Sequence, residues 1–229
     1  MLLKGLQKLT LLDYPGKIAC TVFTGGCNFR CPFCHNASLV IPEKFGVTIP
    51  EEELFSFLEK RRGVLEGVCV SGGEPTLQPD IEDFLGRIKA LGYFVKLDTN
   101  GARPDVLSRL VSAGLADYVA MDIKNSPERY SETVGIGNFD ISPIRKSAEF
   151  LLSGAVDFEF RTTVVRQLHR EEDIRAIGEW LSGSEKFFIQ PFRDSGDLVG
   201  EGLSGYSEAE IATLLDIIRK FVPLAQIRG

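Results

Sequence analysis

Short apolar runs alternate along this chain with stretches whose apolar residues fall on one face of a helix. The runs are rich in β-branched residues, as expected for strands that are buried on both faces. They occupy residues 18–24, 68–71, 93–98, 118–123, 158–165 and 187–191. The helical stretches are residues 51–62, 80–91, 104–113, 144–152, 172–181 and 207–221. This alternation predicts a mainly parallel sheet with right-handed crossover connections.

The six predicted strands indicate an α/β fold, namely a TIM-like partial (β/α)6 barrel that stays open. A complete eightfold barrel usually takes about 250 residues, and a doubly wound open sheet is the alternative. We find no strong repeat and no linker long enough to divide the chain. We therefore expect one domain over residues 1–229, with the barrel core at about 15–195 and a C-terminal helix at about 207–221.

The composition argues against membrane and nucleic-acid partners. No stretch reaches the roughly 18 unbroken apolar residues of a transmembrane helix, and residues 1–8 lack the apolar core of a secretory signal. A net charge of -6 does not favour a large cationic surface for phosphate backbones. We therefore expect a soluble cytoplasmic protein.

Polar and glycine-rich clusters follow the carboxyl ends of the predicted strands. They lie at residues 27–36, 72–75, 98–101, 122–124 and 190–193. A further charged residue, Arg161, lies within the fifth predicted strand. Active sites of parallel α/β folds lie at the carboxyl ends of the strands, so these clusters are expected to converge at one opening.

Three of the five cysteines lie within eight residues of one another. Cys27, Cys31 and Cys34 form a C-x3-C-x2-C pattern that follows Gly25 and Gly26. Three thiolates can hold three irons of a 4Fe-4S cluster, which leaves the fourth iron open for chemistry. An odd number of clustered cysteines does not suit a disulfide framework, so the pattern predicts a metal centre in a reducing compartment.

A structural zinc site is the competing interpretation, because tetrahedral zinc accepts three sulfurs and one imidazole, here that of His35. Such sites usually draw a second ligand pair from farther along the chain, and only one other histidine is present. That residue, His169, lies among charged residues and is expected to be a solvated loop residue. Cys20 and Cys69 lie in strand-like runs and are expected to be small core residues.

A second motif, Gly72-Gly73-Glu74-Pro75, follows the second predicted strand. Glycines let a backbone approach a ligand closely, and a carboxylate suits an ammonium group. Together with the cysteine pattern, this motif resembles the radical S-adenosylmethionine (SAM) superfamily. A closer resemblance is to the glycyl radical enzyme activating proteins, and among them to the anaerobic ribonucleoside-triphosphate reductase activating proteins. The segments that carry it, within about residues 5–195, are 12–17, 24–36, 71–75, 97–101 and 121–124.

The resemblance implies one 4Fe-4S cluster on the three cysteines and SAM on its open iron. It implies that Glu74, with the backbone at Gly72 and Gly73, holds the SAM ammonium group and that Arg161 suits the SAM carboxylate. The other residues expected at the SAM site are Asp98, Asn100, Asp122, Lys124 and Arg193, the last lying where some relatives have a histidine. The residues expected around the cluster, where they would limit access of water and oxygen, are Phe29, Phe33, His35 and Asn36.

Several alternatives remain open at this point. For Asp98 and Asp122, the alternative role is capping of the turns that follow them. The activity that the resemblance implies is reductive cleavage of SAM to a 5'-deoxyadenosyl radical, which generates a glycyl radical on a partner enzyme. The expected partner is an anaerobic ribonucleotide reductase, and the expected electron donor is a flavodoxin or ferredoxin. The rivals are a radical SAM enzyme acting on a small molecule, as in deazapurine synthesis, or on another peptide, and a non-catalytic zinc-binding or electron-transfer module.

Overall fold

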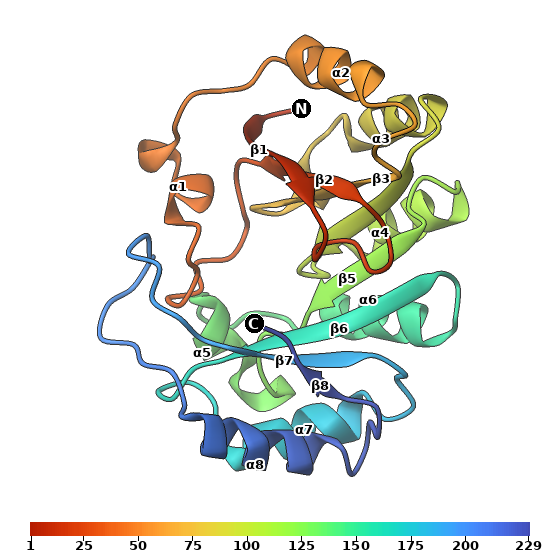
Figure 1. The fold of residues 1–229 in the computed structure, drawn as a ribbon. Coiled ribbons are helices and arrows are strands. Elements are labelled where there is room, and N and C mark those ends of the chain that lie inside the picture. Colours follow the sequence, from red (N-terminus) through yellow and green to blue (C-terminus); the bar gives the residue numbers. More distant parts are fainter.

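Eight strands form one curved sheet in which the spatial order follows the chain (Figure 1). The computed structural model describes residues 1–229. The strands are β1 (Leu3–Thr10), β2 (Ala19–Thr24), β3 (Gly67–Gly72), β4 (Phe94–Thr99), β5 (Tyr118–Asp122), β6 (Asp157–Val164), β7 (Phe187–Pro191) and β8 (Gln226–Ile227). The first pair, β1 and β2, is antiparallel, and all later neighbours are parallel.

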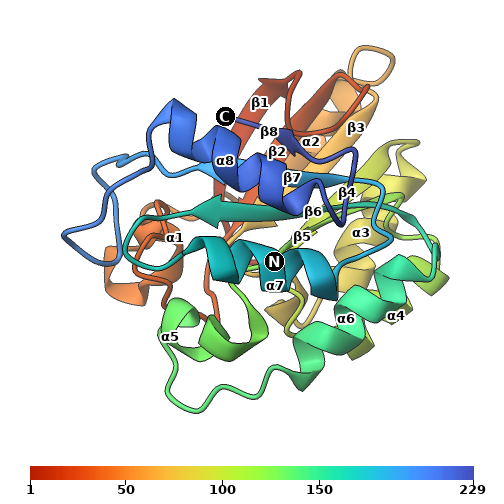
Figure 2. The same ribbon diagram turned by 90° about the horizontal axis from the view of Figure 1, so that it is seen from below.

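The longer helices lie along the outer side of this sheet (Figures 1 and 2). The short helices α1 and α5 and the loops next to them lie apart from that layer. The helices are α1 (Ala37–Val40), α2 (Glu51–Lys60), α3 (Ile81–Ala90), α4 (Pro104–Ser112), α5 (Tyr130–Val134), α6 (Ser142–Leu152), α7 (Glu171–Trp180) and α8 (Glu208–Ile218). Three short 3-10 turns lie at Pro42–Lys44, Pro75–Leu77 and Pro127–Arg129. Helix α4 shows why the outer helices pack here, because its buried residues Val106, Leu107, Leu110 and Val111 recur at helical spacing on one face.

The predicted partial barrel is confirmed, and the doubly wound alternative is wrong. Strands β2–β7 correspond to the six predicted strands and lie side by side in chain order, whereas a doubly wound sheet reverses its strand order. The strand count was too low, because β1 and β8 form the two edges of the sheet. Strand β1 pairs irregularly and is exposed near its end, and β8 has only two residues, so neither carries the buried apolar signal of the others.

The end of the barrel opposite the carboxyl ends is filled by Tyr14. Tyr14 is 3% exposed and packs in a small cluster with Ala19, Cys69 and Tyr118. Gly67 makes room for it, because a Cβ atom there would lie 2.8 Å from the Tyr14 ring. The expected core position of Cys69 is confirmed, and that of Cys20, which is fully buried in the main core, is confirmed as well.

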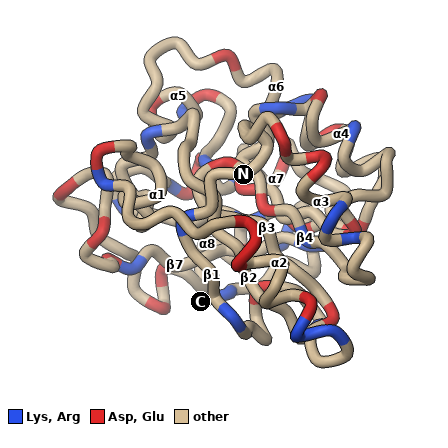
Figure 3. The backbone as a smooth tube through the Cα atoms, turned by 90° about the horizontal axis from the view of Figure 1, so that it is seen from above, with Lys and Arg blue, Asp and Glu red and all other residues tan.

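Charged residues of both signs are interspersed along the chain, as the view in Figure 3 shows. This distribution accompanies the net charge of -6. None of the helices is both long enough and apolar enough to cross a lipid bilayer.

A buried ion pair attaches the C-terminal strand to the sheet. Glu159 on β6 is fully buried and accepts hydrogen bonds from Arg228, with Nη1 at 2.5 Å and Nη2 at 3.0 Å. The Tyr118 hydroxyl donates to the same carboxylate at 2.9 Å. The Arg228 guanidinium also lies 3.4 Å from the centre of the Phe188 ring. These contacts compensate the charge of a carboxylate that has lost its water.

We expect Arg228→Ala to lower the free energy of unfolding by about 3 kcal/mol, because the fully buried Glu159 then loses the cation that is hydrogen-bonded to it. Adding Glu159→Gln to this variant should recover part of the loss, because a neutral amide carries no charge. The measurement is anaerobic urea denaturation. The control is Arg109→Ala, which removes an exposed ion pair with Glu82 and should cost less than about 1 kcal/mol. Equal losses for both arginines would contradict this account.

Candidate active site

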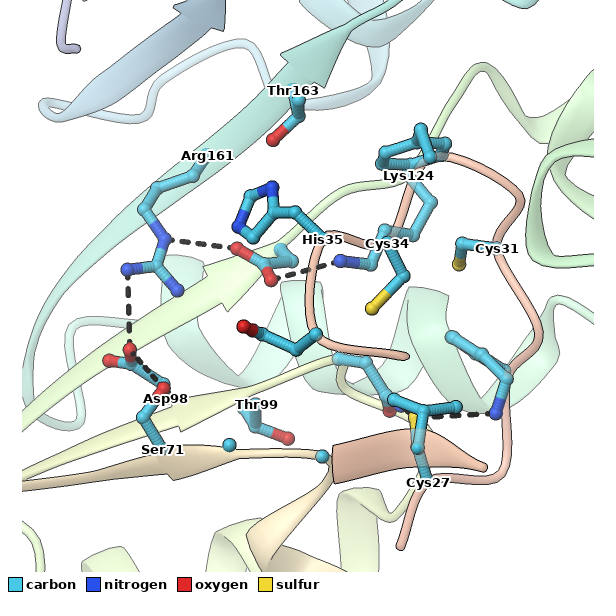
Figure 4. A pocket seen from close by; sticks show the side chains of 18 of the residues that line it. Cys27, Cys31, Cys34, His35, Ser71, Asp98, Thr99, Lys124, Arg161 and Thr163 are labelled. Atoms are coloured by element: carbon cyan, nitrogen blue, oxygen red, sulfur yellow. Dashed lines mark hydrogen bonds and ion pairs between the residues drawn. The ribbon is translucent and has the colours of Figure 1, made fainter. Parts of the chain in front are cut away.

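The three clustered cysteines lie on the loop between β2 and α1 and face one cavity of about 320 Å³. Cys31 is buried, and Cys27 and Cys34 are half-buried. Figure 4 shows the three sulfurs on one side of the cavity, with Asp98 and Arg161 on the other side. The loop thus brings three thiols to the carboxyl ends of the parallel strands, as predicted.

Hydrogen bonds from several parts of the chain hold this cysteine loop. The Arg30 side chain donates to the carbonyl oxygens of Cys27 at 2.7 Å and Phe29 at 2.8 Å. The segment after β7 contributes the Gly200 amide, which donates to the Pro32 carbonyl at 2.8 Å. A Cβ atom on Gly200 would lie 2.7 Å from the Pro32 side chain, so this close approach requires glycine.

Gly72 and Gly73 bring the end of β3 against the cysteine loop. A Cβ atom on Gly72 would lie 2.3 Å from the Thr24 backbone, and one on Gly73 would lie 2.0 Å from the Gly26 oxygen. The Gly73 amide donates to the Thr24 carbonyl at 2.9 Å. Both glycines also line the cavity. Their lack of side chains therefore serves contact with the cysteine loop as well as access to the cavity.

Charged side chains from three neighbouring strands form a connected network beside the cavity. The β5–β6 register places Asp122 opposite Arg161, whose Nε donates to Asp122 Oδ1 at 2.9 Å. Arg161 Nη1 reaches Asp98 Oδ2 at 3.4 Å, and Lys124 Nζ donates to Asp122 Oδ2 at 2.9 Å. Lys96, which is 1% exposed, forms an ion pair with Asp98 two residues farther along β4. Three cations therefore face two carboxylates.

Both carboxylates of this network are held in their ionised form. Burial alone would raise the pKa of Asp122, but the charges of Arg161 and Lys124 outweigh burial and hold its pKa well below its usual range. The pKa of Asp98 is lowered in the same way by Arg161 and Lys96 against the effect of burial. Their side chains pair with these cations and with Ser71, so the alternative role as turn caps is wrong.

Most of the predicted site residues line the same cavity. Besides the three cysteines, Gly72 and Gly73, these are Phe29, Phe33, His35, Asn36, Asp98, Asn100, Asp122, Lys124 and Arg161. Phe29 and Phe33 are both nearly fully buried, as expected for side chains that exclude water from a metal site. His35, by contrast, is exposed, although it also lines the cavity.

The Glu74 side chain does not line the cavity, contrary to the prediction that it holds an ammonium group there. It is fully buried. Its carboxylate accepts from the Thr76 amide at 3.1 Å, the Thr99 hydroxyl at 2.8 Å and the Asn100 amide at 2.6 Å. The carboxylate therefore joins the loop after β3 to the end of β4, and the donors of these loops occupy its oxygens.

Arg193 also differs from its prediction, because it is exposed and does not line the cavity. Gln190 does line it, from the end of β7. Gln190 lies on β7 opposite Thr163 of β6, and both side chains line the cavity. Arg193 lies beyond the end of β7, so the strand does not direct its side chain toward the cavity.

His169 is the third correction, because it is fully buried rather than solvated. Its Nδ1 accepts from the Val165 amide at 3.1 Å, so Nε2 carries the proton and donates to the Lys124 carbonyl at 2.8 Å. Burial lowers the pKa of this imidazole, which favours the neutral form. His169 therefore fixes the backbone of a residue that lines the cavity.

Sequence reasoning missed several residues of the cavity wall. They are Phe23, Val40, Ser71 and Thr163, whereas Thr99 and Gln190 belong to the polar clusters at residues 98–101 and 190–193 that were expected at this opening. Strand alternation could have found some of them, since Ser71 lies at the end of β3 and Thr163 lies two residues after Arg161 on the same face of β6.

Comparison with known proteins identifies the family. The model of the radical SAM superfamily matches residues 21–177, which include the cysteine loop and the five carboxyl ends from β2 to β6. The chain belongs to the radical SAM superfamily. A candidate glycyl-radical enzyme activating enzyme of Methanocaldococcus jannaschii is 34% identical over 99% of this chain and 95% of its own length. The pyruvate formate-lyase 1-activating enzyme of Escherichia coli K12 is 29% identical over 81% of this chain and 78% of its own length.

Solved structures share the fold of this radical SAM enzyme. Streptococcus suis SuiB bound to its precursor peptide SuiA aligns with a TM-score of 0.71 over 91% of this chain and 48% of SuiB, at 14% identity. The relatives place this radical SAM oxidoreductase among the glycyl-radical enzyme activating enzymes. The family uses a 4Fe-4S cluster and SAM.

The cavity fits these two groups. Burial raises the pKa of Cys27 to about 11 and that of Cys31 to about 12, so a bound cation has to compensate the thiolate charge. No three or more His, Cys, Asp or Glu side chains are grouped to hold a single metal ion, so the geometry does not support a zinc site with His35. The three thiols would instead bind three irons of a cluster, with the charged network beside it for SAM.

Replacing Cys27, Cys31 or Cys34 by Ala is expected to abolish cluster assembly and SAM cleavage, because two thiolates do not retain a stable cubane cluster. Cys20→Ala and Cys69→Ala are the matched controls and should keep full iron content, because both thiols are buried in the core away from the cavity. The measurements are iron and sulfide content and 5'-deoxyadenosine formation under anaerobic conditions. Full turnover of Cys31→Ala would disprove the ligand assignment.

Proposed function

We propose that this radical SAM enzyme generates a glycyl radical on an anaerobic ribonucleoside-triphosphate reductase, with a flavodoxin or ferredoxin as the electron donor. One observation carries the proposal. The three-thiol loop and the charged network line the same cavity, at the carboxyl ends of an open parallel sheet. Similarity to a candidate activating enzyme over 99% of the chain supports the activase assignment. The segments at residues 12–17 and 97–101 support the choice of partner by their resemblance to reductase activating proteins.

The proposed roles follow from the charges around the cavity. With three cations and two carboxylates, the network has one surplus positive charge, which suits the SAM carboxylate at Arg161 or Lys124. The backbone edge at Gly72 and Gly73 suits the SAM ammonium group, a role that the buried Glu74 side chain leaves to the backbone. When both are bound, the cluster and SAM supply an electron and a 5'-deoxyadenosyl radical that abstracts a hydrogen atom.

The open sheet gives a protein substrate a route to this cavity. Strands β1 and β8 are the two edges and do not pair, so the barrel is not closed by hydrogen bonds at that side. A glycyl radical forms on a backbone Cα, which has to come within about 3 Å of the attacking carbon. We therefore expect a glycine-containing loop of the partner to enter with little recognition of a side chain at the glycine itself. The buried rings of Phe29 and Phe33 keep water away from the reacting atoms.

Arg161→Gln is expected to weaken SAM binding roughly tenfold to a hundredfold, because a charged hydrogen bond contributes about 1.5–3 kcal/mol. The variant should still fold and hold the cluster, since Asp98 keeps Lys96 and Asp122 keeps Lys124. SAM affinity is measured anaerobically by titration of the cluster spectrum. Arg109→Gln, on the exposed face of α4, is the matched control and should bind SAM normally. An unchanged SAM affinity of Arg161→Gln would contradict the assigned role.

The substrate class is tested with deuterium at the Cα of the glycine in a peptide that copies the radical-bearing loop of an anaerobic ribonucleotide reductase. We expect deuterium in 5'-deoxyadenosine and a glycyl doublet in electron paramagnetic resonance (EPR) spectra of the full-length partner. The matched control is the same peptide with alanine in place of glycine.

The partner assignment is tested by running a pyruvate formate-lyase peptide in parallel. Transfer from that peptide alone would reassign the partner but keep the activase. No transfer from any glycyl peptide, with efficient transfer from a small molecule such as a deazapurine precursor, would overturn the proposed function.

A further inference from the structure

Glu74 fixes the first residues after β4 from a fully buried position. Its Oε2 accepts from the Asn100 amide at 2.6 Å, and its Oε1 accepts from the Thr99 hydroxyl at 2.8 Å. Thr76 supplies two more donors, its amide at 3.1 Å and its hydroxyl at 2.5 Å. Oε1 thus accepts from three protein donors and Oε2 from one, and the fully buried side chain does not line the cavity. The position of this carboxylate therefore fixes the backbone amide of Asn100.

The Asn100 side chain has one possible orientation. Its Oδ1 accepts from the Ala102 amide at 2.9 Å, so the amide group cannot be flipped without leaving that donor unpaired. The Nδ2 group therefore points toward the cysteine loop. It donates to Asn28 Oδ1 at 2.8 Å and to Cys27 Sγ at 3.8 Å. A side chain that is 5% exposed is thus directed at a ligand sulfur.

Cys27 receives a second donor from its own loop, the Phe29 amide at 3.4 Å. Among the donors to the three ligand sulfurs, Asn100 is the one that comes from a different part of the chain. The hydrogen bond from Asn100 to Cys27 Sγ therefore depends on the position of the end of β4 relative to the cysteine loop. Glu74 and the close approach of Gly73 to Gly26 determine that position.

We propose that Asn100 raises the reduction potential of the cluster through its hydrogen bond to Cys27 Sγ, and that Glu74 is the positioning residue that holds Asn100 in place. Reduction adds one electron to the cluster and increases the negative charge on its sulfurs. An N–H donor stabilises that charge more in the reduced state than in the oxidised state, so the potential rises. The proposal rests on Cys27 being a cluster ligand, and it gives the acidic residue of the Gly-Gly-Glu motif a role that does not involve contact with SAM.

The test is a redox titration of the anaerobically purified, cluster-loaded protein, followed by the EPR signal of the reduced cluster without SAM or partner. Asn100→Ala should shift the potential to a more negative value at full iron content. Glu74→Gln should shift it in the same direction by a smaller amount, because the neutral side chain holds the Asn100 amide less firmly. The double variant should match Asn100→Ala alone, since both changes act on one hydrogen bond.

The matched control is Asn125→Ala. Asn125 is also fully buried and uses its Nδ2 group, but it bonds Thr133 Oγ1 and the Leu168 carbonyl rather than a ligand sulfur. Its variant should keep the potential of the parent protein. An unchanged potential in cluster-loaded Asn100→Ala, or an equal shift in Asn125→Ala, would overturn the proposal.

A measurement on the unaltered sequence covers the case in which these variants do not fold. Protein labelled with 15N at asparagine side chains should show nitrogen and exchangeable-proton couplings to the reduced cluster in pulsed EPR spectra. Absence of the nitrogen coupling would overturn the proposal, because the Phe29 amide gives Cys27 Sγ an exchangeable proton in any case. Neither readout uses a glycyl partner or SAM cleavage, so failure here is distinguishable from failure of the proposed activase function.

Discussion

The ion pair between Arg161 and Asp122 determines the form of the cavity mouth. Parallel register places the two residues opposite each other on β6 and β5, and Arg161 then spans to Asp98 on β4. Buried charges are stable only when each has partners that replace its water. Lys96 and Lys124 complete this requirement for the two carboxylates. The network thereby joins the carboxyl ends of three strands and leaves one positive charge in surplus beside the thiols.

Backbone contact couples this network to the cysteine loop. Gly72 and Gly73 let the end of β3 touch the residues before Cys27, and any side chain there would collide with that backbone. Glu74 then ties the same loop to the end of β4, next to Asp98. The loop after β3 therefore contacts both the cysteine loop and the end of β4. A change in this loop would move the thiols and the charged groups together.

The sequence predicted the central part of the fold well, because β2–β7 are buried on both faces and leave a continuous apolar signal. It did not reveal β1 and β8, which lie at the edges and share little of the core. It located the thiols, the glycines and most charged residues, since these lie within the predicted strands or directly after them. It misplaced Glu74 and His169, which have hydrogen-bond partners from distant segments, and Arg193, which is exposed beyond the end of β7.

The sequence by itself determined the chemistry that the cavity contains. Three thiols on a loop after the first parallel strand, and charges at the ends of the later strands, follow from local pattern and from the direction shared by parallel strands. Only the tertiary structure decided which side chains reach the cavity. Glu74 is turned away by donors from Thr76, Thr99 and Asn100, and Gln190 rather than Arg193 faces inward because of its register on β7. Whether a polar side chain meets a ligand or a neighbouring loop depends on distances between strands, which no local pattern records.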